Sequence, residues 1–541
     1  MNKQKKFMTG ILGAIAVYIA VITATADITR GIGLEEKQPP SENVQVSSNE
    51  ADTTNLKAEQ EHSLEGYNTS LEKVENASAE SNNTKITSQP TEVKTINYSF
   101  TNKQKSNIFD NPNNGKVMDT LIKATRVEVE EEKDVENQKQ TKVKKADGTF
   151  EIKVTGQINK WAKIKYQKNL KNKEGWIKAE NLNKEFNSVI SADLKNIDFS
   201  SVEKPNFTEN PKKTNVRGIY LTVYSAASDK KMDELIALTK RTPINAFVID
   251  VKDDSGHLLF KTDAEKTYLG ENKKYYPIAD MEKFMKKLKD NNIYTIARIV
   301  SFKDPRYAKK NPDKAIIKRA DGTPYTNSDG VIWVSAHDRN LWKYNIDVAK
   351  EAAKLGFNEI QFDYVRFPAS NGGKLDKQLD YRNVKSETKP ETIQKYLKYA
   401  RKELQPLGVY ISADVYGQVG SSADDMGLGQ HWETVSNEVD IISPMAYPSH
   451  YGNGVYGLSV PDANPYATIY RSTIDGVNRN NNITYPANVR PWLQAFTAKW
   501  VKGYIPYGKK EIDAQVKALK DLGINEYLLW SPSNRYGIVE K

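Results

Sequence analysis

The sequence predicts an α/β fold in which a closed (β/α)8 barrel follows a small all-β barrel and a disordered tether. Three observations lead to this prediction. From about residue 215 to the C-terminus, strand-like and helix-like patterns alternate eight times. Residues 95–185 contain short strand-like runs with turn signals between them. Residues 31–94 are rich in Ser, Thr, Asn, Glu and Lys and almost free of aromatics, which is typical of a disordered linker.

The first thirty of the 541 residues are predicted to form a signal or membrane-anchor segment. Residues 1–6 contain three lysines, and residues 7–26 carry no charge. The small residues at 24–26 would permit cleavage, whereas the length of the apolar run favours an uncleaved anchor. In either case we expect the rest of the chain to lie outside the cytoplasm, anchored to the cell membrane or secreted to the cell wall.

Composition limits the chemistry that the chain can perform. The absence of cysteine excludes disulfides, thiolate metal sites and cysteine nucleophiles. The formal charge of +10 and the pI of about 9.0 fit an anionic surface such as a cell-wall polymer, and they fit an ordinary solvated surface equally well. The sequence has no cluster of Lys and Arg interleaved with aromatic residues, so nothing in it suggests a nucleic-acid partner.

Residues 95–185 resemble a bacterial SH3-like domain. The resemblance rests on the opening Asn107-Ile108-Phe109, on the strand-like residues 161–164 and on residues 174–182. In that family the module often binds peptidoglycan, although a spacer barrel without a ligand is an equal alternative. A long charged insertion, residues 133–154, departs from the family pattern.

Residues 214–541 are expected to form the (β/α)8 TIM barrel. A doubly wound sheet would need a glycine-rich phosphate loop after the first strand, and residues 224–228 do not supply one. Glycines follow two expected helices at 356 and 523, and almost no sequence remains for a last helix. The expected strands are 216–223, 246–252, 294–302, 359–367, 409–416, 440–447, 489–496 and 526–531. The expected helices are 231–240, 279–289, 341–354, 391–403, 465–478 and 511–522.

The fourth expected strand is the most informative. In residues 359–367, apolar Ile360 and Phe362 alternate with Glu359, Gln361 and Asp363, and Pro368 ends the run. Asp363 therefore stands on the polar face near the carboxyl end of the strand. In a parallel barrel that end opens into the active site.

The same alternation predicts which residues of the other strands point into the barrel. Three acids, two bases and several aromatics collect near the top, where a purely structural barrel would carry Val, Ile and Leu. Buried charges are costly unless they are paired, so Asp363 could simply pair with Arg366 or Arg298, and Asp250 with Lys252. The expected inward residues are Asp250, Lys252, Arg298, Asp363, Asp414, Tyr447, Trp492, Gln494 and Trp530.

Two carboxylates beside aromatic platforms suggest glycoside hydrolysis. One acid protonates the leaving oxygen, and the other acts as a nucleophile or activates water. We expect Asp363 and Asp414, on neighbouring strands, to be the catalytic pair. The remaining inward residues are expected to bind substrate, with Asp250 in a positioning role.

Residues 215–537 also resemble an uncharacterised bacterial family of glycosyl-hydrolase-like TIM barrels. The resemblance implies a barrel related to α-amylase-like retaining glycosidases, with Asp363 at the nucleophile position. The acid of such enzymes is usually Glu, whereas this chain has Asp414, so Glu433 is a possible substitute. The motifs are VRGIYLT (216–222), FVIDVKD (247–253), IQFDYVRFP (360–368), SADVYG (412–417), ISPMAYPSHY (442–451) and RPWLQAF (490–496).

The sequence leaves three functional hypotheses. The first is an extracytoplasmic glycoside hydrolase acting on a cell-wall or capsule polysaccharide, without a cofactor. The second is a non-catalytic saccharide-binding protein on the same barrel. The third, a metal-dependent deacetylase, is disfavoured because no HxH or HExxH spacing and no Asp-His-His ligand set is present.

Overall fold

The structure is a computed structural model that describes residues 97–113, 115–200, 202–270, 275–327, 329–370 and 373–540. The expected targeting segment, residues 1–30, and the expected tether, residues 31–94, lie outside these ranges. Within them, no helix combines the length and the hydropathy that a membrane crossing requires.

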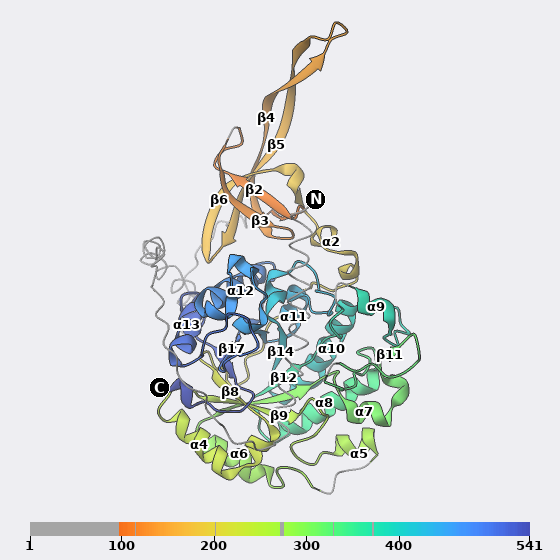
Figure 1. The fold of residues 1–541 in the computed structure, drawn as a ribbon, viewed down its shortest axis with the longest axis vertical. Helices are drawn as coiled ribbons and strands as arrows, with labels where there is room; N and C mark the ends of the chain where they lie inside the picture. Colours follow the sequence, from red (N-terminus) through yellow and green to blue (C-terminus); the bar gives the residue numbers. More distant parts are fainter. Residues whose placement is uncertain are drawn as a thin grey trace, which may run out of the picture. The chain divides into compact units, whose positions relative to one another are not determined.

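The first described element is a seven-stranded antiparallel sheet with the strand order β3-β2-β6-β5-β4-β1-β7 (Figure 1). Ile108, Val127, Ala162, Ile164 and Ile177 form its apolar core. The sheet spans the range in which we expected short strands, and its resemblance to SH3-like domains stays a prediction. Its strands are β1 (Tyr98–Thr101), β2 (Lys105–Phe109), β3 (Val117–Ile122), β4 (Arg126–Lys144), β5 (Phe150–Lys168), β6 (Lys171–Lys178) and β7 (Leu182–Asn183).

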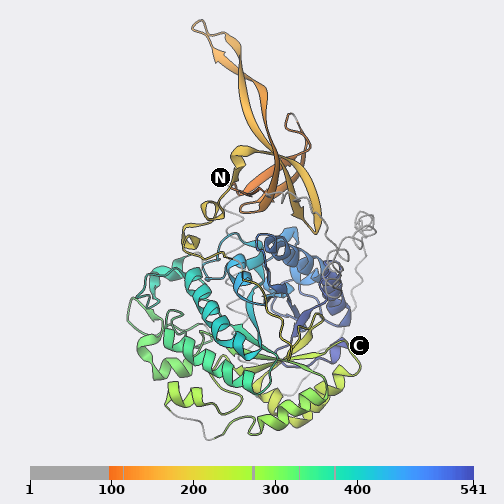
Figure 2. The same cartoon turned by 180° about the vertical axis from the view of Figure 1, so that it is seen from behind.

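The charged insertion in this region is the outer part of a long β-hairpin. Strands β4 and β5 have 19 residues each and stay paired from Glu128↔Lys165 to Lys144↔Phe150. Near their inner ends they also pair with β1 and β6, whereas the outer residues pair only with each other. Figure 2 shows this ribbon projecting from the small sheet.

The second sheet is a closed parallel barrel, which confirms the predicted (β/α)8 fold. Eight staves follow the order β8, β9, β10, β12, β14, β15, β16/β17 and β18, and the pairing of β18 with β8 completes the circle. The strands are β8 (Arg217–Leu221), β9 (Ala246–Lys252), β10 (Tyr294–Val300), β12 (Glu359–Asp363), β14 (Tyr410–Tyr416), β15 (Ile441–Met445), β16 (Asn488–Val489), β17 (Trp492–Gln494) and β18 (Tyr527–Trp530).

Helices cover the outside of the barrel at the predicted places, within a few residues of the predicted bounds. Gly356 and Gly523 adopt positive φ angles of 96° and 72° just past α8 and α13, as C-terminal glycines do. Among the residues described after β18, the short η10 (Gly537–Val539) is the one helical element. The principal helices are α4 (Asp229–Thr239), α6 (Met281–Asp290), α8 (Arg339–Lys354), α10 (Lys389–Leu404), α11 (Trp432–Glu438), α12 (Pro465–Asn480) and α13 (Lys509–Lys520).

Two strand predictions need correction. Strand β12 ends at Asp363, not at residue 367, because Tyr364 adopts a left-handed backbone with φ of 48° that leaves the β region. The stave predicted for residues 489–496 consists of two short pieces, β16 and β17. Pro491 lies between them and cannot donate to a ladder.

A buried ion cluster closes the barrel at the amino ends of its strands, which we call the floor. Arg490 contacts Glu359 at 2.7 Å and Glu526 at 2.7 Å, and the Tyr294 hydroxyl donates to Glu359 at 3.1 Å. All four residues are at most 7% exposed. Asn210 of the preceding segment donates to the backbone carbonyls of Asn358 and Gly408, next to the starts of β12 and β14. These polar contacts fix the lower end of the barrel.

Candidate active site at the carboxyl ends of the barrel strands

Alternation along the strands brings polar side chains together at the upper end of the barrel. In β12, Ile360 and Phe362 pack outward in the main hydrophobic core, so Gln361 and Asp363 face inward. In β14, the outward residues Ile411, Ala413 and Val415 leave Ser412 and Asp414 facing inward. Strands β12 and β14 pair directly, so Asp363 and Asp414 belong to neighbouring staves.

Arg298 stands between two of the predicted acids. Its Nη1 is 2.5 Å from Oδ1 of Asp250, and its Nε and Nη2 donate to Oδ2 of Asp363 at 3.1 and 2.5 Å. Burial acts to lower the pKa of Arg298, but the two carboxylates more than offset it and raise that pKa. The guanidinium therefore stays charged and holds the end of β10 to the ends of β9 and β12.

Asp250 belongs to the same network. The hydroxyl of Tyr220 on β8 donates to Oδ2 of Asp250 at 2.6 Å. Burial raises the pKa of Asp250 to about 6, although the Arg298 charge and the Tyr220 hydrogen bond oppose the rise. Asp250 therefore pairs with Arg298, not with Lys252 as the sequence suggested.

Asp414 has a different environment. It is 1% exposed, and its Oδ1 accepts a hydrogen bond of 2.7 Å from the indole of Trp492. Burial raises the pKa of Asp414 well above its usual range, and the charge of Asp363 raises it further, against the opposing effects of Trp492 and Arg298. Both effects favour the protonated form of Asp414 over the charged form.

An aromatic cluster borders these acids. The Tyr447 ring is 5.3 Å from that of Trp530, and Phe496 meets Trp530 edge-on at 5.2 Å. Trp500 stacks on Phe496 at 5.8 Å and is 37% exposed. The charges of Asp414 and Asp363 act on the Tyr447 hydroxyl and, together with burial, raise its pKa well above the usual range. The rings thus extend from the acids to the protein surface.

Backbone strain accompanies the site at Tyr364, whose left-handed φ is uncommon for an aromatic residue. Its amide donates to Oδ1 of Asp363 at 2.5 Å. Lys303 lies 4.9 Å from the centre of the Tyr364 ring and forms ion pairs with Asp254 and Asp329. This turn fixes the direction of the Asp363 carboxylate.

Two predicted substrate-binding residues do not join this group. Lys252 is fully buried, and its ammonium contacts Asp304 at 2.7 Å, Asn345 of α8 at 2.9 Å and the carbonyl of Val300. Gln494 is also fully buried, and its amide contacts Asp462 and Ser449. Lys252 is thus held toward α8 and Gln494 toward residues 449 and 462, whereas the contacts of Asp250, Asp363 and Asp414 join them to Arg298 and Trp492.

Glu433 is not a substitute for Asp414 as the acid. It lies on α11 outside the barrel, where Arg479 contacts both carboxylate oxygens and His431 is 3.2 Å away. Burial acts to raise its pKa, but Arg479 and His431 outweigh this effect and lower it to about 2. Glu433 is ionised at any ordinary pH and has no proton to give.

Three members of the site were missing from the sequence prediction: Tyr220, which contacts Asp250, and Phe496 and Trp500 of the aromatic cluster. Tyr220 was detectable, because it occupies an inward position of the first strand by the same alternation that identified Asp363. Phe496 and Trp500 follow β17 in a loop, and no periodic pattern reports the direction of loop side chains.

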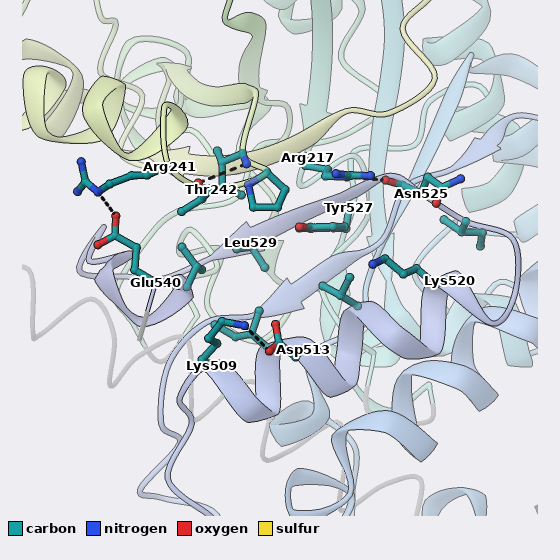
Figure 3. Close-up of a pocket in the computed structure, with 16 residues that line it drawn as sticks. Arg217, Arg241, Thr242, Lys509, Asp513, Lys520, Asn525, Tyr527, Leu529 and Glu540 are labelled. Atoms are coloured by element: carbon teal, nitrogen blue, oxygen red, sulfur yellow. Dashed lines mark hydrogen bonds and ion pairs between the residues drawn. The ribbon is translucent and has the colours of Figure 1, made fainter. Parts of the chain in front are cut away.

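A groove of about 510 Å³ lies elsewhere, on the outside of the barrel. Figure 3 shows its walls, which come from the segment after α4, from α13 and from the outward residues Tyr527 and Leu529 of β18. None of the predicted catalytic or substrate-binding residues lines it. Val539 of η10 and Glu540 also line it, next to β18.

Across the described ranges, no group of three or more His, Asp or Glu side chains is arranged to hold a metal ion. The buried basic side chains of the site already form ion pairs with carboxylates. The cluster thus offers three carboxyl groups, one guanidinium and several aromatic rings.

Comparison with known proteins identifies the family. Residues 218–536 match the family described as "Putative glycosyl hydrolase domain", which covers more than half of the chain. The chain belongs to this family. Its barrel is accordingly a glycoside hydrolase-like domain. No match was found among curated proteins.

Solved structures with similar folds were also found. A hypothetical protein from Ruminiclostridium thermocellum ATCC 27405 is 34% identical over 39% of this chain and 98% of its own, with a TM-score of 0.32. The PgaB (BpsB) glycoside hydrolase domain from Bordetella bronchiseptica is 13% identical over 59% and 94%, with a TM-score of 0.42. The α-galactosidase TtGalA from Thermus thermophilus is 10% identical over 70% of each chain, with a TM-score of 0.37.

Proposed function

We propose that this protein is an extracytoplasmic glycoside hydrolase that acts on a cell-wall or capsule polysaccharide by a retaining mechanism. One observation carries the proposal. Two inward carboxyl groups on neighbouring staves are in different electrostatic environments: Arg298 binds Asp363 through two nitrogens, whereas the Asp414 carboxyl accepts from the Trp492 indole and has its pKa raised by burial and by the charge of Asp363. A glycosidase needs one ionised and one protonated carboxyl group.

In this mechanism Asp363 is the nucleophile and Asp414 the general acid. A carboxylate oxygen of Asp363 bonds to the anomeric carbon while the bond to the leaving oxygen breaks and Asp414 gives that oxygen its proton. Asp414 then removes a proton from water, and the water oxygen displaces Asp363 from the anomeric carbon. The amide of Tyr364 and the guanidinium of Arg298 hold the nucleophile in place throughout.

The substrate class follows from the surroundings of the acids. Tyr447, Trp530, Phe496 and Trp500 form a continuous aromatic cluster that reaches the surface, and aromatic faces pack well against sugar rings. A cluster of this extent suits a polymer better than a single sugar. The net charge of +10 and the expected N-terminal targeting segment favour an anionic polymer outside the membrane.

The Asp363→Asn variant tests the catalytic role. Asn keeps an oxygen for the Tyr364 amide, and Arg298 keeps its contact with Asp250, so the barrel should stay folded. We expect wild type to release reducing ends from purified peptidoglycan or capsular polysaccharide, and the variant to lose about 10³-fold or more of that rate. Thermal unfolding measured by circular dichroism should be unchanged.

The matched control is Asp380→Asn. Asp380 ends the short strand β13 (Leu379–Asp380) and forms a partly exposed ion pair with Arg382, with no contact to Arg298 or the acids it binds. This variant should therefore hydrolyse at the wild-type rate. Full activity of Asp363→Asn on a polymer that wild type cleaves would refute the nucleophile assignment.

A second function, saccharide binding without turnover, is favoured by the burial of Asp414, which is only 1% exposed. In that case calorimetry would detect binding of wall polysaccharides with no release of reducing ends. Asp414→Asn would then bind as tightly as wild type.

A further inference from the structure

The outer part of the β4–β5 hairpin carries apolar side chains that the chain itself does not cover. We name residues 142–152 the hairpin tip. Phe150 is 57% exposed, Ile152 61% and Val143 45%, and Ile158 further along the ribbon is 71% exposed. A ribbon of two strands has no second layer against which to bury such residues. Their exposure therefore points to a partner outside the chain.

Both faces of the ribbon contribute to this surface. The register pairs Lys144 with Phe150 and Lys142 with Ile152 on one face, and Val143 with Glu151 on the other. A groove on a folded protein partner would contact one face of such a ribbon. A medium that surrounds the tip, such as the interfacial region of a bilayer, would contact both.

The charges of the ribbon are divided along its length. Near the small sheet, the acids of β4 are neutralised by lysines of β5: Glu132 contacts Lys160 at 2.5 Å, and Glu130 contacts Lys165 at 2.5 Å. Residues 137–155 carry five lysines against two acids. In the tip, Lys145 pairs with Glu151 at 3.3 Å, while the Lys142 ammonium lies over the Phe150 ring at 4.5 Å. The excess of positive charge is thus concentrated at the outer end.

We propose that the hairpin tip docks into the surface of an anionic phospholipid bilayer. Phe150, Ile152 and Val143 would enter the boundary between head groups and acyl chains, and Lys142, Lys144 and Lys145 would meet the lipid phosphates. A phosphate-rich polysaccharide would satisfy the lysines but would offer no apolar phase for the three hydrophobic residues. The bilayer therefore fits both halves of the surface. This proposal is independent of the hydrolytic one.

The absence of cysteine allows a direct test. In the full chain reconstituted into vesicles, Ile152→Cys is labelled with the environment-sensitive fluorophore NBD. We expect blue-shifted, stronger emission in vesicles that contain phosphatidylglycerol, and quenching by a nitroxide-labelled lipid. In phosphatidylcholine vesicles both effects should be weaker, and replacing Lys142, Lys144 and Lys145 by Gln should remove the difference between the two lipids.

Val384→Cys, labelled in the same way, is the matched control. Val384 is apolar and 91% exposed, but it lies in a loop of the barrel domain, so its label should report water in both kinds of vesicle. Equal emission at the two positions would overturn the proposal. So would a response of the label at 152 to soluble polyphosphate but not to vesicles, which would identify a phosphate polymer instead. A response to protein concentration without vesicles would identify a second copy of the chain.

Discussion

The two ends of strand β12 carry ion clusters of similar composition but different completeness. At the floor, Arg490 neutralises Glu359 and Glu526, and the cluster contains one cation for two acids. At the carboxyl ends of the strands, which we call the mouth, Arg298 binds Asp250 and Asp363 in the same way. A third acid, Asp414, lies beside them and accepts a hydrogen bond from an indole. The floor cluster is buried, whereas the side chains of Arg298 and Asp363 are 12% and 10% exposed.

This comparison separates a structural cluster from a chemical one. At the floor, Arg490 contacts both acids and no acid is left over. The mouth combines two acids that share one guanidinium with a third, Asp414, whose pKa is raised by burial and which accepts from an indole instead. An excess acid that costs stability is tolerated where it contributes to function.

The largest effect is expected at the floor. Arg490→Met would leave Glu359 and Glu526 buried without a cation, and we expect a loss of about 3–5 kcal/mol in the free energy of unfolding. The measurement is chemical denaturation followed by tryptophan fluorescence. The matched change at the mouth, Arg298→Met, should cost less stability because that cluster is partly exposed, while it should abolish activity. Equal stability losses would remove the distinction between the two clusters.

The next effect concerns Asp414, the proposed general acid. Asp414→Asn removes the proton donor while keeping an oxygen for Trp492, and we expect kcat to fall by about 10²-fold or more. In wild type the rate should fall as the pH rises through the raised pKa of Asp414, because the acid must be protonated to act. The variant should lack this alkaline limb. A pH–rate profile with the same alkaline limb in both proteins would assign that limb to another group.

The smallest effect is expected at the outer end of the aromatic cluster. Trp500→Ala should raise KM for a long polysaccharide by about tenfold, which corresponds to about 1.4 kcal/mol, and leave kcat nearly unchanged. Trp500 stacks on Phe496 at the surface, far along the cluster from the acids. Tyr224→Ala, at a 73% exposed tyrosine of the short helix α3 (Val223–Ala227), serves as the control. A fall in kcat without a change in KM would contradict a binding role.

Much of the fold and the centre of the site could be predicted from the sequence, because both depend on period-two alternation. The predictions that Arg298, Asp363 and Asp414 face inward required only the identity of the outward residues. Lys252 did not follow the pattern. The register of β9 against β10 shifts between Arg298 and Ile299, and this irregularity directs the end of β9 toward α8. Such a register shift depends on how two strands pair, so it cannot be predicted from the sequence of either strand alone.

The remaining differences have similar causes. Gln494 has the inward register but is enclosed by Asp462 and Ser449, which come from loops more than thirty residues away. Tyr364 continues the alternating pattern, yet its left-handed backbone ends the strand. Local patterns reported strand faces correctly and failed where distant loops or strained turns determined the environment.

The short length of β12 has one more consequence. Glu359 and Asp363 lie four residues apart on the same face, about 13 Å along the strand, and each is bound to an arginine on a different stave. A shift by one residue would turn both carboxylates to the helix side at once. Inserting a single amino acid anywhere between them would therefore break one of the two anchors, so this segment should accept substitutions far more readily than changes in length.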